Sequence, residues 1–270
     1  MNPFKRLLGQ PGGPVPVGTW VMSASPIVAE AVGLSGFDWA VLDMEHSPLD
    51  LMGLVHVLQA LAGTPMLPVV RVPWNDTVTI KRVLDAGAQT LLIPFVQNAD
   101  EARAAGAATR YPPEGVRGMA GMSRGSRFGT APDYLKRANE GQCVILQLET
   151  KEAVANLEAI AAVAGVDALF LGPADLSATM GLPGQLMHAD VVALMAQAVA
   201  RCRVLGMHVG TVGGTAEVVA QYRAMGFTYL AIASDLGLLM RGLQAAAAAV
   251  RAPGEGGAAP ASAPKAAGGY

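Results

Sequence analysis

Short apolar segments alternate with amphipathic segments along almost the whole chain, and this alternation restricts the possible folds more than any other feature. The segments with the length and composition of β-strands are Gly18–Met22, Trp39–Asp43, Pro68–Val72, Thr90–Pro94, Cys143–Glu149, Ala168–Gly172, Met207–Thr211 and Tyr229–Ala233. The helical segments that follow them are Ile27–Leu34, Leu49–Leu61, Thr77–Ala86, Asp100–Thr109, Lys151–Ala161, Val191–Leu205, Thr215–Met225 and Leu236–Val250. Strands that alternate with helices are expected to be parallel. Eight such units favour a single α/β domain folded as a (β/α)8 TIM barrel over a doubly wound sheet, which usually has fewer strands.

The composition is consistent with one domain and no membrane segment. Of the 270 residues, 52% are hydrophobic, but the longest apolar stretches, such as Thr90–Val96, are the length of a strand. A helix that spans a bilayer needs roughly 20 apolar residues, so we expect no membrane partner. The barrel domain is expected over residues 1–251. Residues 252–270 are almost all Gly, Ala, Pro and Ser, and this composition predicts a disordered tail.

Net charge, the first ten residues and the two cysteines indicate the class of ligand, the location and the state of the thiols. The formal net charge is −2, and no cluster of Lys or Arg is dense enough to bind nucleic acid, so a small-molecule ligand is expected. Residues Met1–Gln10 lack the apolar run of a secretory signal, which favours a cytoplasmic location. Cys143 and Cys202 have neither metal-binding nor disulfide spacing and are expected to be buried thiols.

Two acidic residues come at the ends of neighbouring strands, where a TIM barrel places its reactive groups. These are Glu149 and Asp175. Two carboxylates that face one barrel mouth repel each other unless a cation lies between them. Without a matched His or Cys, the pair suits Mg²⁺ or Mn²⁺, which would keep water and substrate oxygens as further ligands. The alternative is that each acid only caps a helix.

His46 is the only histidine that follows a strand directly, and it is the candidate general base. A carboxylate could fix its tautomer, either Asp43, three residues earlier, or Asp85, late in the helix after the third strand. The alternative is a hydrogen-bonded structural histidine.

Arg71 ends an otherwise apolar strand, so its guanidinium is expected to contact an anion. It could stabilise the enolate or carboxylate oxygens of a keto acid. A salt bridge to Glu45 or Glu149 that closes the barrel mouth is the alternative.

The long connection from Thr109 to Tyr134 is rich in arginine, and loops of this length are usually functional or build an interface. Arg124 and Arg127 could contact a distal carboxylate of the substrate in a neighbouring subunit's site. A plain salt bridge at an interface is an equal alternative.

The strand ends resemble those of the class II pyruvate aldolases of the HpcH/HpaI family, over about Val17 to Val250. Five ordered motifs carry the resemblance: Asp43-Met44-Glu45-His46-Ser47-Pro48; Pro68-Val69-Val70-Arg71 with Trp74-Asn75-Asp76; Thr109-Arg110-Tyr111-Pro112-Pro113 through Gly115-Val116-Arg117-Gly118; Gln147-Leu148-Glu149-Thr150; and Gly172-Pro173-Ala174-Asp175-Leu176-Ser177.

The resemblance implies a (β/α)8 barrel that binds Mg²⁺, Mn²⁺ or Co²⁺ and assembles as a homohexamer, a dimer of trimers. It implies reversible cleavage of 4-hydroxy-2-oxo acids, such as the 4-hydroxy-2-oxoheptanedioate of aromatic catabolism, to pyruvate and an aldehyde through a metal-stabilised enolate. The implied residues are Glu149 and Asp175 as metal ligands, His46 as base, Asp85 as the group that raises the basicity of His46, Arg71 as transition-state stabiliser, and Gln147, Ala174, Asp175 and Arg71 as substrate contacts.

Two departures from the family pattern, Met44 and the segment Gly210–Gly214, leave the substrate open. The alternatives are a 2-dehydro-3-deoxy sugar-acid aldolase of the same family, a citrate-lyase-like CoA thioester lyase, or a non-catalytic keto-acid binder. A Schiff-base aldolase is disfavoured, because of the five lysines only Lys151 lies near a strand end.

Overall fold

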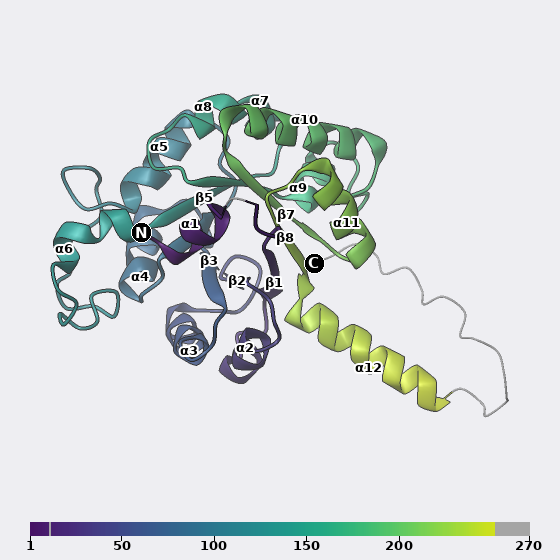
Figure 1. Cartoon of the computed structure of the whole chain (residues 1–270), viewed down its shortest axis with the longest axis horizontal. Coiled ribbons are helices and arrows are strands. Elements are labelled where there is room, and N and C mark those ends of the chain that lie inside the picture. Colours follow the sequence, from purple (N-terminus) through teal and green to yellow (C-terminus); the bar gives the residue numbers. More distant parts are fainter. Residues whose placement is uncertain (11, 252–270) are drawn as a thin grey trace.

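The computed structural model describes residues 1–10 and 12–251, and in this part of the chain eight parallel strands form a closed barrel with helices around it (Figure 1). The strands are β1 (Val17–Val21), β2 (Trp39–Asp43), β3 (Leu67–Arg71), β4 (Thr90–Ile93), β5 (Cys143–Leu148), β6 (Ala168–Leu171), β7 (His208–Gly213) and β8 (Tyr229–Ser234). Each strand pairs with the next in sequence, and β8 pairs with β1. The (β/α)8 prediction is confirmed. The tail predicted over residues 252–270 lies outside the described residues.

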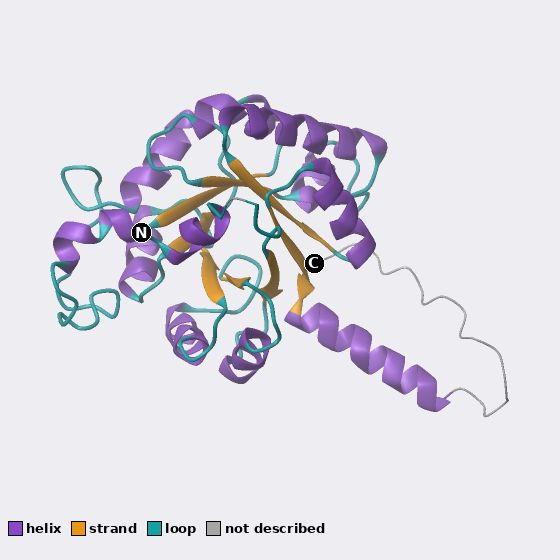
Figure 2. Cartoon of the chain, in the orientation of Figure 1, coloured by secondary structure: helices purple, strands orange, loops and turns teal. Residues whose placement is uncertain are grey.

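The helices alternate with the strands as predicted, with some additions (Figure 2). The helices are α1 (Pro3–Leu8), α2 (Pro26–Gly33), α3 (Leu51–Leu61), α4 (Thr77–Asp85), α5 (Ala99–Ala108), α6 (Tyr134–Arg137), α7 (Lys151–Ala155), α8 (Leu157–Ala161), α9 (Pro173–Thr179), α10 (Ala189–Leu205), α11 (Ala216–Met225) and α12 (Asp235–Arg251), with a 3-10 turn at Asn139–Gly141. The predicted helix Lys151–Ala161 is interrupted at Asn156, whose side chain donates a hydrogen bond to the carbonyl of Gln97 at 2.9 Å. Helices α1, α6 and α9 were not predicted, because each is too short to show a helical period.

Helix α1 closes the amino-terminal end of the barrel. It begins at Asn2, whose side chain accepts hydrogen bonds from the backbone of Phe4 and Lys5 and donates to the carbonyls of Gln89 and Gly141. The side chain of Phe4 is buried inside the barrel. The first residues of the chain therefore belong to the core of the barrel.

The interior of the barrel combines aromatic rings with aliphatic side chains. Trp39 and Tyr229 pack edge to face, with ring centroids 5.6 Å apart, and both also contact Phe4. Two glycines make room for them: a Cβ on Gly18 would lie 2.4 Å from the ring of Trp39, and one on Gly210 would lie 2.3 Å from the ring of Tyr229. Small residues opposite large ones allow the strands to close around this core.

Helix α12 projects away from the barrel instead of packing on its outer face (Figure 1). Of its residues only Asp235 is buried, and that carboxylate accepts hydrogen bonds from the backbone of Met22 at 2.9 Å and Ser23 at 3.1 Å. The first turn is therefore fixed to the loop after β1, while the rest of the helix is exposed. None of the helices in residues 1–10 and 12–251 combines the length and apolarity that crossing a membrane requires.

The long connection after α5 leads into β5 at the amino-terminal end of the barrel, and it is bound to the end of α4. The Arg117 guanidinium donates to the Asp85 carboxylate at 2.7 Å, the backbone N–H of Gly125 donates to the Asp85 carbonyl at 3.0 Å, and Arg124 donates to the Ala86 carbonyl at 3.0 Å. Arginines at the carboxyl end of a helix satisfy its last carbonyls and oppose its dipole.

Candidate active site

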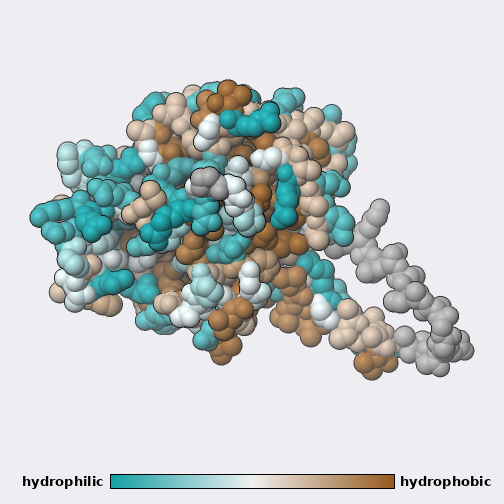
Figure 3. Space-filling model, in the orientation of Figure 1, coloured by the Kyte–Doolittle hydropathy of each residue, from teal (hydrophilic) through white to brown (hydrophobic). Residues whose placement is uncertain are grey.

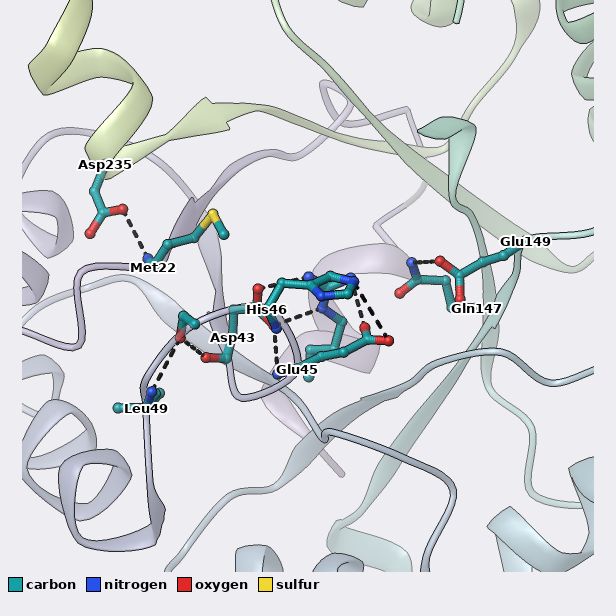
Figure 4. A network of polar contacts seen from close by, with 10 residues as sticks. Met22, Asp43, Glu45, His46, Leu49, Gln147, Glu149 and Asp235 are labelled. Carbon is teal, nitrogen blue, oxygen red and sulfur yellow. Dashed lines mark hydrogen bonds and ion pairs between the residues drawn. The ribbon is translucent and has the colours of Figure 1, made fainter. Parts of the chain in front are cut away.

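The predicted reactive residues other than Asp85 gather at the carboxyl end of the barrel strands, where a TIM barrel places its active site. Figure 4 shows Asp43, Glu45 and His46, at and just after the end of β2, on one side of the mouth, with Gln147 and Glu149, at the end of β5, across from them. These elements are far apart in sequence, and the closed sheet brings their ends together.

Arg71 ends β3 and is buried, although it carries a charge. Its guanidinium donates two hydrogen bonds to Asp43, through Nε at 2.8 Å and Nη2 at 2.7 Å, and pairs with Glu45 through Nη1 at 3.0 Å. Its Cζ lies 5.7 Å from the centre of the Trp20 ring. This bidentate pairing fixes the plane of the guanidinium. The salt bridge to Glu45 foreseen as an alternative exists, in addition to the pair with Asp43.

Glu149 is buried, and each of its carboxylate oxygens accepts one hydrogen bond. Oε1 accepts from the Gln147 side chain at 2.7 Å, and Oε2 accepts from the backbone N–H of Phe95 at 2.9 Å. The Gln147 Oε1 atom is also buried and has no hydrogen-bond partner among the described residues. An amide oxygen left in this state indicates a site built to receive another donor.

Two acidic side chains at the mouth, Glu45 and Glu149, have raised pKa values. The pKa of Glu149 is raised to about 8, mainly by burial and then by the negative charges of Glu45 and Asp175, while Arg71 opposes the rise. Burial also raises the pKa of Glu45. The negative charges of Glu45 and Asp175 thus add to the effect of burial on Glu149.

Asp175 lies in the first turn of α9, which starts with Pro173 directly after Gly172. A Cβ on Gly172 would lie 2.7 Å from Glu149 Oε1 and 3.0 Å from Gln147 Nε2, so only glycine leaves these side chains where they are. The first-turn N–H groups of a helix, here including Ala174, have no carbonyl within the helix to bind.

His46 is at the mouth with its side chain 56% exposed, and its Nε2 lies 3.8 Å from Glu45 Oε1. Asp85 does not come near it in the same chain. Asp85 ends α4, which runs down the outside of the barrel to the start of β4, so it lies at the opposite end of the barrel from His46. There it pairs with Arg117.

Two residues of the site were not identified from the sequence. The sequence indicates Glu45 only as a partner for Arg71, although its place beside His46 also marks it as a third carboxylate. No pattern in the sequence marks Phe95, because its contact with Glu149 is made by the backbone N–H and does not depend on the side chain.

The donor set at the mouth fits a hard divalent cation. In the described part of the chain, no three or more His, Cys, Asp and Glu side chains are grouped so as to enclose a metal ion. A cation bound by Glu149 and Asp175 would therefore take its remaining ligands from water or substrate oxygens, as Mg²⁺ and Mn²⁺ commonly do. Such a cation would also offset the repulsion that raises the pKa of Glu149.

Comparison with known proteins agrees with this geometry. Residues 17–242 match the family model described as HpcH/HpaI aldolase/citrate lyase. A 2-dehydro-3,6-dideoxy-6-sulfogluconate aldolase from Pseudomonas putida is 51% identical over 225 residues, 83% of this chain and 88% of the relative. A 4-hydroxy-2-oxo-heptane-1,7-dioate aldolase from Salmonella dublin is 46% identical over 92% of this chain and 94% of its own length.

A solved structure of an HpcH/HpaI aldolase/citrate lyase family protein from Burkholderia cenocepacia superposes with a TM-score of 0.90. It is 40% identical and covers 93% of this chain and 100% of its own. The expected resemblance is confirmed, and the chain belongs to the HpcH/HpaI aldolase/citrate lyase family.

Proposed function

We propose that this protein is a metal-dependent aldolase that cleaves the C3–C4 bond of a 4-hydroxy-2-oxo acid to give pyruvate and an aldehyde, with Mg²⁺, Mn²⁺ or Co²⁺ held by Glu149 and Asp175. The observation that carries the proposal is the buried Glu149 carboxylate, which is oriented by hydrogen bonds on both oxygens and whose pKa is raised in part by the charge of Asp175. Its raised pKa means that the ionised carboxylate is unfavourable there unless a cation lies beside it. The aldolase activity itself agrees with both of the curated relatives named above.

The residues at the mouth divide the chemistry between them. When bound, the divalent cation supplies Lewis-acid polarisation of the substrate's keto group. His46, exposed at the mouth, accepts the proton of the C4 hydroxyl, which becomes the carbonyl of the leaving aldehyde. The electron pair of the broken C3–C4 bond passes into the enolate of pyruvate. Arg71, held in a fixed plane by Asp43, stabilises that negative charge.

Two further groups are proposed to hold the pyruvate portion of the substrate. The Gln147 amide carries a second N–H besides the one that it donates to Glu149, and Ala174 contributes an N–H from the first turn of α9, so both would donate to the pyruvate oxygens. Both come from the same side of the mouth as Glu149. Pyruvate would thus be oriented before the bond breaks, which removes part of the entropic barrier.

The substrate beyond C4 has two candidates, one from each curated relative. One relative acts on 4-hydroxy-2-oxo-heptane-1,7-dioate and the other on 2-dehydro-3,6-dideoxy-6-sulfogluconate, so the distal group would be a carboxylate or a sulfonate. Both acids present the same 4-hydroxy-2-oxo unit to the site. The higher identity of the sulfogluconate aldolase, 51% against 46%, favours including the sulfonate in any first assay.

A role for Asp85 beside His46 requires more than one copy of the chain, since the two lie at opposite ends of the barrel. The exposed helix α12 supports self-association. Its exposed large apolar side chains include Leu236, Leu239, Met240, Leu243 and Val250. These five fall on one helical stripe, and Figure 3 shows hydrophobic residues along the helix. We propose a homo-oligomer, with the hexamer implied by the family as its full form, in which Asp85 of one copy approaches His46 of another.

Pyruvate release, coupled to lactate dehydrogenase, tests the function. The two candidate acids would be compared with Mn²⁺, Mg²⁺ or Co²⁺, and with EDTA. We expect release that EDTA abolishes and Mn²⁺ restores. His46→Asn should lower kcat by about 100-fold or more, whereas His56→Asn, an exposed histidine within α3, should leave it unchanged.

Other outcomes would redirect the assignment. Trapping of a covalent pyruvate adduct by borohydride would indicate a Schiff-base aldolase instead. Absence of release from either acid and from oxaloacetate, with every metal, would contradict the aldolase. Binding of CoA in that case would indicate the thioester lyase, and keto-acid binding without turnover would indicate a non-catalytic binder.

A further inference from the structure

We propose that Trp74 and Phe95 form a positioning pair, in which the Trp74 ring holds Phe95 in the backbone conformation that orients the Glu149 carboxylate. The inference deepens the proposed function and rests on it, because it assumes that Glu149 binds a metal ion. Neither side chain is expected to touch the metal or the reacting atoms.

The contact between Phe95 and Glu149 is one of two that fix this carboxylate. The Phe95 N–H donates to Oε2 at 2.9 Å, and Gln147 donates to Oε1 at 2.7 Å. The next N–H along the chain, that of Val96, donates to the Gln147 carbonyl at 3.2 Å. The segment after β4 is thus bonded to the end of β5 at two consecutive residues. Each oxygen of Glu149 keeps a lone pair for a cation.

Phe95 makes this contact from an unfavourable backbone conformation. Its φ angle is +57°, in the left-handed region that bulky residues rarely adopt. A glycine would adopt the same φ without this cost. Conformations of this kind persist only where the surroundings hold them, and they are frequent at functional sites. Something outside the backbone of Phe95 must therefore maintain it.

The ring of Trp74 provides that restraint. The Trp74 and Phe95 rings are stacked, with centroids 5.8 Å apart and planes inclined by 27°. An offset stack of two aromatic rings contributes stabilisation of the same order as the cost of one left-handed residue. Trp74 is 55% exposed, so burial in the core does not account for its position.

Trp74 itself belongs to a well-fixed turn between β3 and α4. Its carbonyl accepts a hydrogen bond from the Asp76 N–H at 2.9 Å, and Asp76 in turn caps α4 by accepting from the Thr79 N–H at 2.8 Å. The Asn75 side chain donates to the Glu101 carbonyl at 3.0 Å, which joins the turn to α5. Helices α4 and α5 therefore fix the turn that carries Trp74, and Trp74 in turn fixes Phe95, whose N–H orients Glu149.

Titration of the metal-free, full-length protein with Mn²⁺, followed by electron paramagnetic resonance, tests the pair without any need for turnover. Trp74→Ala should weaken Mn²⁺ affinity about 10-fold, the lower end of the effect of losing a group that orients a metal ligand. Trp74→Phe, which keeps a ring to stack on Phe95, should recover most of that affinity. Val78→Ala, an equally exposed apolar residue in the first turn of α4, is the control and should bind Mn²⁺ as the wild type does.

A double-mutant cycle separates restraint of the backbone from a general effect on the loop. Phe95→Gly keeps the N–H and removes the left-handed strain, so in that background Trp74→Ala should have little further effect on Mn²⁺ affinity. Thermal unfolding of each variant verifies that it is folded.

Several results would overturn the inference. If Trp74→Ala binds Mn²⁺ like the wild type but raises KM, the ring contacts substrate and does not position Glu149. If Trp74→Ala and Phe95→Gly are additive, or Val78→Ala weakens binding equally, the pair does not act as a unit. If the wild type does not bind Mn²⁺ at all, both the proposed function and the role of the pair are wrong. If the wild type binds Mn²⁺ and Trp74→Ala binds it equally well, only the role of the pair is wrong.

Discussion

Negative charge in a buried space governs the behaviour of single residues at the barrel mouth. Asp43, Glu45, Glu149 and Asp175 all contribute carboxylates, and Arg71 balances only part of this charge. Asp43 is neutralised by its bidentate pair with Arg71, so it serves to orient that arginine. Glu149 gains most from a bound cation, because burial and nearby negative charges both oppose its ionisation.

Metal binding should therefore release a proton from Glu149. The pKa of this side chain is raised from an ordinary 4.5 to about 8, so at lower pH the metal-free protein holds a proton that a cation must displace. Mn²⁺ affinity is expected to rise about tenfold per pH unit between roughly pH 6 and pH 7.5. Calorimetric titration in buffers of different ionisation enthalpy would count the proton. An affinity independent of pH would contradict the assignment of Glu149 as a ligand.

The same shift has a consequence for the metal-free fold. Because the folded pKa lies above the unfolded value, protonation of Glu149 stabilises the fold, fully below about pH 4.5 and no longer above about pH 8. Thermal stability without metal should fall across this interval. Glu149→Gln, which cannot ionise, is the control and should lack this contribution.

At the scale of elements, the site depends on how closely the strands approach one another. The number and stagger of the strands set the diameter of the barrel, and Gly18 and Gly210 allow β1 and β7 to pass beside Trp39 and Tyr229. The strand ends that carry Arg71 and Glu149 are positioned by this closure. Packing at the centre of the barrel thus affects the geometry at its mouth.

Gly210→Ala should destabilise the protein by about 1–3 kcal/mol or more, because the added methyl group overlaps the ring of Tyr229, which the closed barrel holds in place. Gly214→Ala, just after β7, meets no atom within 4 Å and should change stability by less than about 0.5 kcal/mol. Urea unfolding of both variants gives the comparison. Equal stability of the two would show that the Tyr229 ring can move aside.

At the scale of the whole molecule, a single copy leaves the apolar side chains of helix α12 exposed to solvent. Its apolar stripe projects into solvent, while its first turn is fixed to the barrel through Asp235. A helix that exposes so many large apolar side chains indicates an interface. The proposed approach of Asp85 from a second copy to His46 also requires an oligomer.

Leu239→Glu combined with Leu243→Glu should therefore disrupt the assembly, because two charges would enter a buried apolar interface. Ala245→Glu adds a charge on the opposite side of the same helix and should leave the assembly intact. Light scattering after size-exclusion chromatography would report the mass in each case. A wild type that elutes at the 27.7 kDa of a single chain would contradict the proposed oligomer.

The sequence by itself determined the barrel and most of the candidate site. Eight alternating strands and helices can close in few ways, and parallel strands bring all their carboxyl ends to one face. Once the strands were located, Arg71, Gln147 and Glu149 had to meet there, whatever the details of packing. His46 and Asp175 followed, because each lies within a few residues of the end of a strand.

Only the tertiary structure decided where the less regular parts lie. Asp85 is on the same domain as His46 but at the other end of the barrel, which depends on the direction in which α4 runs. The contact of Phe95 with Glu149 comes from a backbone angle held by a stacked ring, and neither leaves a pattern in the sequence. The insertion of Phe4 into the amino-terminal end of the barrel and the direction of α12 likewise depend on contacts between residues far apart in the chain. Periodic patterns record local geometry, whereas these features depend on long-range packing.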